Sequence, residues 1–95
     1  MILRVFAVFD VKAKYFMQPF VMKTSAEAVR VFGDMCQNAQ NPLGRHPADY
    51  TLFEIGQYDD ASAMFTQDGA HVPLGNGLEH VVEEEPLRLE ERVAS

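Results

Sequence analysis

The sequence predicts a small α+β domain, with a mainly antiparallel sheet in the order β-β-α-β-β and one helix packed on one face of that sheet. Several short segments alternate apolar and polar residues, as strands do, and a single segment has helical spacing. The chain has 95 residues, which suits one domain with one core. We expect that domain at residues 1–82, followed by an acidic C-terminal tail at residues 83–95.

Alternation with a period of two marks the strands. Residues 2–9 predict the first strand, and the aromatic and apolar residues 15–22 predict the second. Pro19 has no N–H to donate to a ladder, so the second strand should lie at an edge or contain a bulge. The segment ADYTLFEIGQYDD, residues 48–60, predicts the third strand. Two shorter strands are expected at residues 63–66 and 78–82.

The helix is expected at residues 25–38. Thr24 and Glu27 have the spacing of a capping box, in which each side chain accepts a hydrogen bond from a free amide at the helix start. A proline- and glycine-containing connection at residues 38–47 should end the helix. The apolar residues that follow the cap lie along one side of a helix: Ala28, Val29, Phe32, Met35 and Cys36.

One helix covers only one face of a sheet. We expect it on the side of Val5, Ala7, Phe9, Phe53 and Ile55, since Ala7 leaves room for a helix. The opposite, uncovered face would then carry Arg4, Phe6, Val8, Tyr50, Leu52, Glu54 and Tyr58. Exposed apolar patches of this kind usually mark an interface. We therefore expect a homodimer or higher homo-oligomer, formed through Phe6, Val8, Tyr50, Leu52 and Tyr58, with DNA binding as an alternative or additional use of this face.

The charge is concentrated near the C-terminus. The net charge is −6, which ordinarily argues against a nucleic-acid partner. Residues 79–95 hold six acidic and two basic residues, whereas residues 1–78 hold eight acidic and six basic ones. The body of the domain is therefore close to neutral. The tail has three interpretations: solubilising charge, competition with phosphates for basic residues, or recruitment of a protein partner through Leu87 and Leu89.

Catalytic chemistry has little support in the sequence. The histidines, His46, His71 and His80, lack the spacing of a metal-binding motif. Asp59 and Asp60 end a strand, where acids most often face solvent. Cys36, the single cysteine, lies on the apolar side of the helix and is expected to be an inert core thiol. We predict no catalytic residue, metal or cofactor, and no apolar run approaches the ~18 residues of a membrane span.

The first hairpin suggests nucleic-acid binding. Proteins hold single strands by stacking bases on aromatic rings and by placing cations near the phosphates. The hairpin offers Lys12, Lys14, Tyr15 and Phe16 together. Other basic residues are expected to extend a positive track: Arg4, Lys23, Arg30, Arg45 and His46. The competing interpretation is that the aromatic residues only pack the core and an edge strand, while the lysines keep a turn soluble.

Two long segments resemble a known family. They are VFAVFDVKAKYFMQPFVMKTSAEAVRVFGDM, residues 5–35, and HPADYTLFEIGQYDD, residues 46–60, with NP between them and a weaker echo in PLG, residues 73–75. They are similar to the small nonstructural proteins of gokushoviruses, in the Microviridae, which are icosahedral phages with single-stranded DNA. The shared features are a strand ending in Asp followed by Lys, a PF pair before a helix, and HPxDY leading into a strand of the form LFxIGx[FY]DD. The tail after Glu83 is longer and more acidic than that family suggests, and Ala48 stands where an acid is common.

The resemblance implies a non-enzymatic protein that binds single-stranded viral DNA in the host bacterial cytoplasm, during genome replication or packaging. The alternative function is a protein-interaction module, either a phage assembly factor or a regulator of the replication protein. That module would use the uncovered sheet face, and the acidic tail would contact a phage or host protein. The resemblance carries over no binding residues, so the candidate sites rest on the residues themselves.

Overall fold

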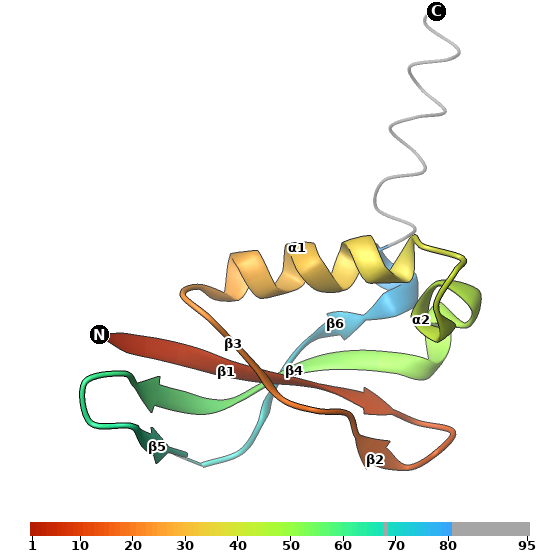
Figure 1. Cartoon of the computed structure of the whole chain (residues 1–95). Helices are drawn as coiled ribbons and strands as arrows, with labels where there is room; N and C mark the ends of the chain where they lie inside the picture. The colour runs from red at the N-terminus through yellow and green to blue at the C-terminus, as the bar shows by residue number, and fades with distance from the viewer. Residues whose placement is uncertain (68, 81–95) are drawn as a thin grey trace, which may run out of the picture.

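The computed structural model describes residues 1–67 and 69–80 of the chain (Figure 1). It confirms the α+β class: six strands form one antiparallel sheet, and the main helix lies across one face of it (Figure 1). Of the predicted domain, the structure thus describes residues 1–80 except residue 68. The predicted tail, residues 83–95, lies outside the described residues.

Two long strands form the centre of the sheet. β1 (Ile2–Asp10) and β4 (Tyr50–Asp59) pair antiparallel along their whole lengths. Short strands flank this pair: β2 (Tyr15–Phe16) and β3 (Phe20–Met22) pair with β1, and β5 (Met64–Thr66) and β6 (Val72–Asn76) pair with β4. Each long strand therefore has one long partner and two short ones, and all four short strands are edge strands.

Pro19 divides the second predicted strand, as its missing N–H requires. β2 and β3 follow each other along β1, and the chain leaves regular pairing between them. The Met17 N–H still donates to the Val8 carbonyl at 2.7 Å, which holds this segment against β1. The prediction of an edge strand with an irregularity is confirmed.

The predicted strand at residues 78–82 is wrong. The last strand is β6, and residues 77–80 are helical, while residues 81 and 82 lie outside the described part. The reason is a second cap: the Leu78 N–H donates to Asn76 Oδ1 at 2.9 Å, and the Asn76 N–H donates to Glu79 Oε2 at 2.8 Å. This reciprocal pattern is a capping box on Asn76-x-x-Glu79, which begins a helix.

The helix α1 (Ser25–Cys36) begins at the predicted cap. The Glu27 N–H donates to Thr24 Oγ1 at 3.2 Å, and the Thr24 N–H donates to Glu27 Oε1 at 3.2 Å. The helix ends two residues earlier than expected, with Gln37 as its C-cap. The connection that follows contains two short helices, α2 (Pro42–Arg45) and the 3₁₀ helix η1 (Pro47–Asp49).

The predicted orientation of the sheet is wrong, because α1 covers the opposite face. The buried cluster consists of Phe6, Val8, Ala28, Phe32, Cys36, Leu43, Tyr50 and Leu52. The helix stripe is thus confirmed, but it packs against the side of the sheet that was expected to be open. Large apolar side chains on that side give the helix a continuous surface, whereas Ala7 contributes little. The polar pair that suggested an open face, Arg4 and Glu54, forms an ion pair at 3.2 Å.

A β-bulge in β4 explains the position of Tyr58. Val5 pairs with Gly56 and Phe6 pairs with Glu54, so Ile55 is an extra residue. An extra residue reverses the alternation of side chains beyond it. Tyr58, two residues past Gly56, therefore points to the face away from α1, although simple alternation groups it with the core residue Leu52.

Leu52→Ala tests the orientation of the sheet. Leu52 is 0% exposed, so we expect the free energy of unfolding to fall by about 2–5 kcal/mol, as for other buried leucines. Val72→Ala, on the same sheet at 52% exposure, is the matched control and should lower the free energy of unfolding far less. Urea unfolding followed by circular dichroism measures both. Equal, small losses would contradict the placement of α1 over Leu52.

Candidate functional site

The sheet face opposite α1, called here the open face, is not covered by any helix of the described residues (Figure 1). The register places the side chains of Val5, Ala7 and Phe9 on this face. Val5 and Ala7 are buried but lie outside the main cluster. Contact with another molecule on the open face therefore falls to its other, more exposed side chains.

An aromatic cluster, Phe9, Phe16, Phe53 and His71, occupies one part of the open face. The Phe16 ring lies at the centre of this cluster. Its centroid is 4.9 Å from that of Phe9, 5.5 Å from that of Phe53 and 5.6 Å from that of His71. Tilted and edge-to-face contacts at such distances are favourable between rings. Phe16 is 41% exposed, so the cluster presents an aromatic surface to solvent.

The hairpin between β1 and β2 places two lysines beside this cluster. The Asp10 carboxylate accepts hydrogen bonds from the N–H groups of Lys12 at 3.0 Å and Ala13 at 3.1 Å. Lys14 closes the turn with a φ of 64°, in the left-handed region. Lys12, Lys14 and Tyr15 are exposed. Tyr15 pairs with Asp10 and Phe16 pairs with Phe9, so the Tyr15 ring points to the sheet face opposite the aromatic cluster. Of the hairpin residues predicted to act together, Tyr15 is thus directed away from Phe16.

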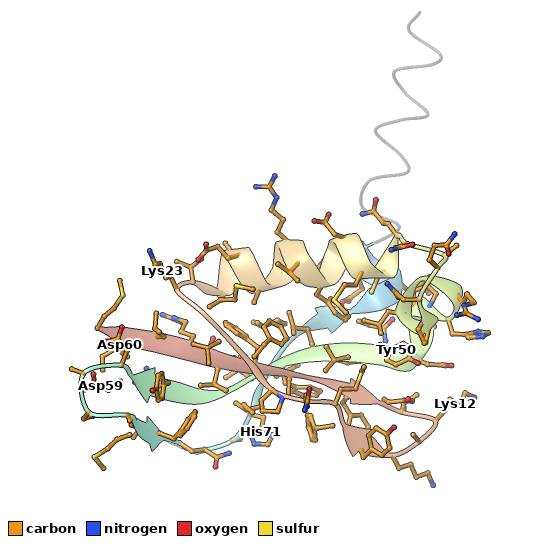
Figure 2. All side chains as sticks on the ribbon, in the orientation of Figure 1. Lys12, Lys23, Tyr50, Asp59, Asp60 and His71 are labelled. Atoms are coloured by element: carbon orange, nitrogen blue, oxygen red, sulfur yellow. The ribbon has the colours of Figure 1, made fainter. Side chains whose placement is uncertain are left out.

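The other predicted basic residues are spread over the molecule. Lys23 and Lys12 lie at opposite ends of it (Figure 2). Arg4 is paired with Glu54, and the exposed Arg30 belongs to α1, on the covered side of the sheet. These cations do not form one track with the hairpin.

Arg45 and His46 are closer to the hairpin. The Val11 N–H donates to the Asp49 carbonyl at 2.9 Å, which joins the hairpin to the α2–η1 connection. The Arg45 guanidinium donates to the Gln40 carbonyl at 3.4 Å, and both Arg45 and His46 are exposed. The end of the molecule that carries Lys12 therefore has additional positive charge.

Four of the five predicted interface residues are buried. Phe6, Val8, Tyr50 and Leu52 form the core under α1, so they do not form an interface. Burial, with the nearby Asp10 and Asp49 carboxylates, raises the pKa of the Tyr50 phenol. The fifth residue, Tyr58, lies on the open face. Sequence analysis missed Phe9, Phe53 and His71, because their meeting with Phe16 depends on strand register.

The candidate acids and histidines are not brought together. The N-terminal amino group lies 2.8 Å from Asp60 Oδ1 and 3.7 Å from Asp59 Oδ1. The hydrogen bond from Ala61 N–H lowers the pKa of Asp59. His80 packs against Phe32 of the core, with ring centroids 5.4 Å apart, whereas His71 lies on the open face. Within residues 1–67 and 69–80, no three His, Cys, Asp or Glu residues are placed to hold a metal ion.

The chain belongs to the Phage ORF5 protein family, whose pattern it matches over residues 3–80. The match includes the hairpin, the helix and all six strands apart from Ile2. Neither the curated proteins nor the solved structures contain a match to this chain. In the described part of the chain, no helix is long and apolar enough to cross a membrane.

Cys36 is predicted to react only when the protein unfolds. The side chain is 1% exposed, and burial raises the pKa of its thiol to about 11, so the nucleophilic thiolate is scarce at pH 8. We expect slow alkylation by iodoacetamide in native buffer and fast alkylation in denaturing urea, measured by mass spectrometry. The thiol of the unfolded chain ionises at a lower pH than the buried thiol. The contribution of Cys36 to the free energy of unfolding should therefore decline as the pH rises through about 9 to 11. Equal alkylation rates in both buffers would contradict the buried position.

Proposed function

We propose that this phage protein binds single-stranded DNA without catalysing a reaction. The observation that carries the proposal is the aromatic cluster on the open face, directly beside the exposed Lys12 and Lys14. Bases would stack on the Phe16 ring, while the lysines contact phosphates. Arg45 and His46, at the same end, would continue the phosphate contacts.

Physical chemistry supports this use of the face. A stacked base contributes about 1–3 kcal/mol, and stacking tolerates any base because every base has a π face. Three of the four rings in the cluster contact Phe16, which restricts its motion before a ligand arrives. A ring held in place by its neighbours loses less conformational entropy on binding than a free one.

The charge distribution supports moderate, salt-sensitive binding. Residues 1–78 have eight acidic and six basic residues, so the domain is nearly neutral and the hairpin lysines are a local feature. The Asp10 carboxylate faces the hairpin backbone, where it accepts hydrogen bonds from two N–H groups. The acidic tail would compete with phosphates for the same lysines, or would contact a phage or host replication or packaging protein.

The biological setting is part of the proposal. Membership of the Phage ORF5 protein family shows a phage protein. The motifs at residues 5–35 and 46–60 support a gokushovirus of the Microviridae, in which the protein would act on viral single-stranded DNA in the host bacterial cytoplasm. Genome replication and packaging are the steps that expose such DNA.

A second candidate function is a protein-interaction module, formed by a second copy of the chain or an assembly partner. The observation in its favour is that two adjacent residues of β5 are strongly exposed although apolar, Met64 at 65% and Phe65 at 68%. Exposed apolar residues of this size are typical of interfaces. A homodimer is compatible with DNA binding, because two hairpins would double the number of cations along one strand.

Substitutions in the hairpin test the proposed function. We expect Phe16→Ala to weaken binding of a fluorescent 30-nucleotide oligothymidylate by about 1–3 kcal/mol, measured by anisotropy. K12Q/K14Q should reduce the slope of log K against log salt by about 1.4, since each phosphate contact on a single strand contributes about 0.7. Lys23→Gln, an exposed cation at the opposite end, is the control and should leave affinity and slope unchanged (Figure 2).

Two results would argue against the proposal. The first is no binding by the wild-type chain at low salt, either intact or ended at Val82 to remove the acidic tail. The second is an equal loss of affinity for K12Q/K14Q and Lys23→Gln, which would indicate general electrostatic attraction rather than a defined binding site. Analytical ultracentrifugation of the same samples measures whether a homodimer exists.

A further inference from the structure

A hollow opens on the sheet beside Gly56, at the bulge of β4. Its volume is about 140 Å³, and Val5, Ile55, Gly56, Phe65 and Gln67 are among the residues that line it. This is about ten times the ~10–15 Å³ that one water molecule requires. A Cβ atom at position 56 would lie 2.7 Å from the Thr66 carbonyl oxygen, so the close approach of β5 requires glycine. The bulge and the glycine together keep side chains out of this part of the sheet.

An exposed aromatic side chain borders the hollow. Phe65 pairs with Tyr58 across β4 and β5, and their ring centroids are 4.8 Å apart. The pairing with Tyr58 places Phe65 on the open face, the same face as the aromatic cluster. Phe65 is 68% exposed, so one surface of a ring already held by Tyr58 is available to a ligand.

A chain of side-chain contacts links the hollow to the aromatic cluster. Gln67 lines it, and the Gln67 side-chain amide nitrogen lies 2.7 Å from His71 Nε2. His71 in turn contacts Phe16. A line of contacts therefore runs over the open face from the hairpin to Phe65.

The chemistry of the hollow suits an uncharged, planar group. All the residues that line it are uncharged, and Gln67 among them carries a side-chain amide. Glutamine amides form hydrogen bonds with base edges, and aromatic rings stack on base faces. The hollow on the other side of the same bulge is lined partly by Glu54, whose carboxylate would repel a nucleic acid. Asp59 and Asp60 lie against the N-terminal amino group.

We infer that Phe65 and the hollow beside Gly56 form a second base-binding position, so that one DNA strand spans the open face from Phe16 to Phe65. This inference rests on the proposed function and names the rest of the binding track. Phe53 and Tyr58 mark the two positions along β4. They pair with Ala7 and Leu3, which are four residues apart on β1, so at ~3.3 Å per residue the two positions lie roughly 13 Å apart. A stacked strand advances ~3.4 Å per nucleotide, so about four nucleotides join the two positions.

The inference is tested by varying the length of the oligonucleotide and by removing the Phe65 ring. For the twelve-nucleotide dT12, Phe65→Ala should weaken binding about 5- to 150-fold, the equivalent of losing one stacked base at ~1–3 kcal/mol. For dT3, which reaches only one position, the loss should stay within about twofold because Phe16 remains. Anisotropy measures the dT12 affinities, and amide chemical shifts in NMR titrations measure those for dT3.

Two further variants separate stacking from other roles. Met64→Ala removes a side chain that is 65% exposed, from the same strand but the opposite face, and should leave dT12 affinity within about twofold of wild type. Phe65→Leu keeps an apolar group but has no π face, so it should also weaken dT12 binding. Circular dichroism checks that each variant remains folded, as the exposure of Phe65 leads us to expect.

The outcomes distinguish the two proposals. If wild type binds dT12, Phe16→Ala weakens it and Phe65→Ala does not, the second position is wrong and the proposed function stands. If Phe65→Leu binds dT12 as tightly as wild type, or if Phe65→Ala converts a dimer to a monomer in ultracentrifugation, the inference is overturned. Phe65 would then be an apolar protein contact. Failure of wild type to bind any oligonucleotide would overturn both.

Discussion

The antiparallel pairing of β1 with β4 is the interaction on which the rest of this structure depends. It joins residues about fifty positions apart and pairs every residue from Ile2 to Asp10. Every other strand is short and attaches to one of these two, so none of them would persist without the central ladder. The pairing also brings Phe6 and Val8 beside Leu52, which creates the apolar surface that α1 covers.

The bulge at Ile55 gives the two ends of the sheet different surfaces. Before it along β4, Tyr50 and Leu52 face the core; beyond it, Tyr58 faces away from α1. The same irregularity places Gly56 next to Thr66 and leaves a hollow there. Bulges commonly redirect side chains near functional sites. The position of Tyr58, and with it the part of the open face beside Phe65, thus depends on the same irregularity that ends the core-facing alternation.

Local signals predicted local structure well. The Thr24–Glu27 capping box set the start of α1, and Pro19 predicted the interruption between β2 and β3, because each acts through bonds to its near neighbours. Asn76 and Glu79 have the spacing of a capping box too, but the sequence analysis predicted a strand at residues 78–82. In the candidate site, the adjacency of Lys12, Lys14, Tyr15 and Phe16 followed from the hairpin, whereas the contacts of Phe16 with Phe53 and His71 did not.

The sequence by itself determined the class of the fold, the position of the helix and its cap, the strand-breaking role of Pro19 and the hairpin that carries the lysines. Only the tertiary structure decided which face of the sheet α1 covers and where Tyr58 points. The physical reason is that alternation defines two faces without ranking them, and a single extra residue in β4 exchanges them. The choice was made by packing: Phe32 and Cys36 of α1 bury Phe6, Val8 and Leu52 together, and the aromatic rings left on the other side became the candidate binding surface.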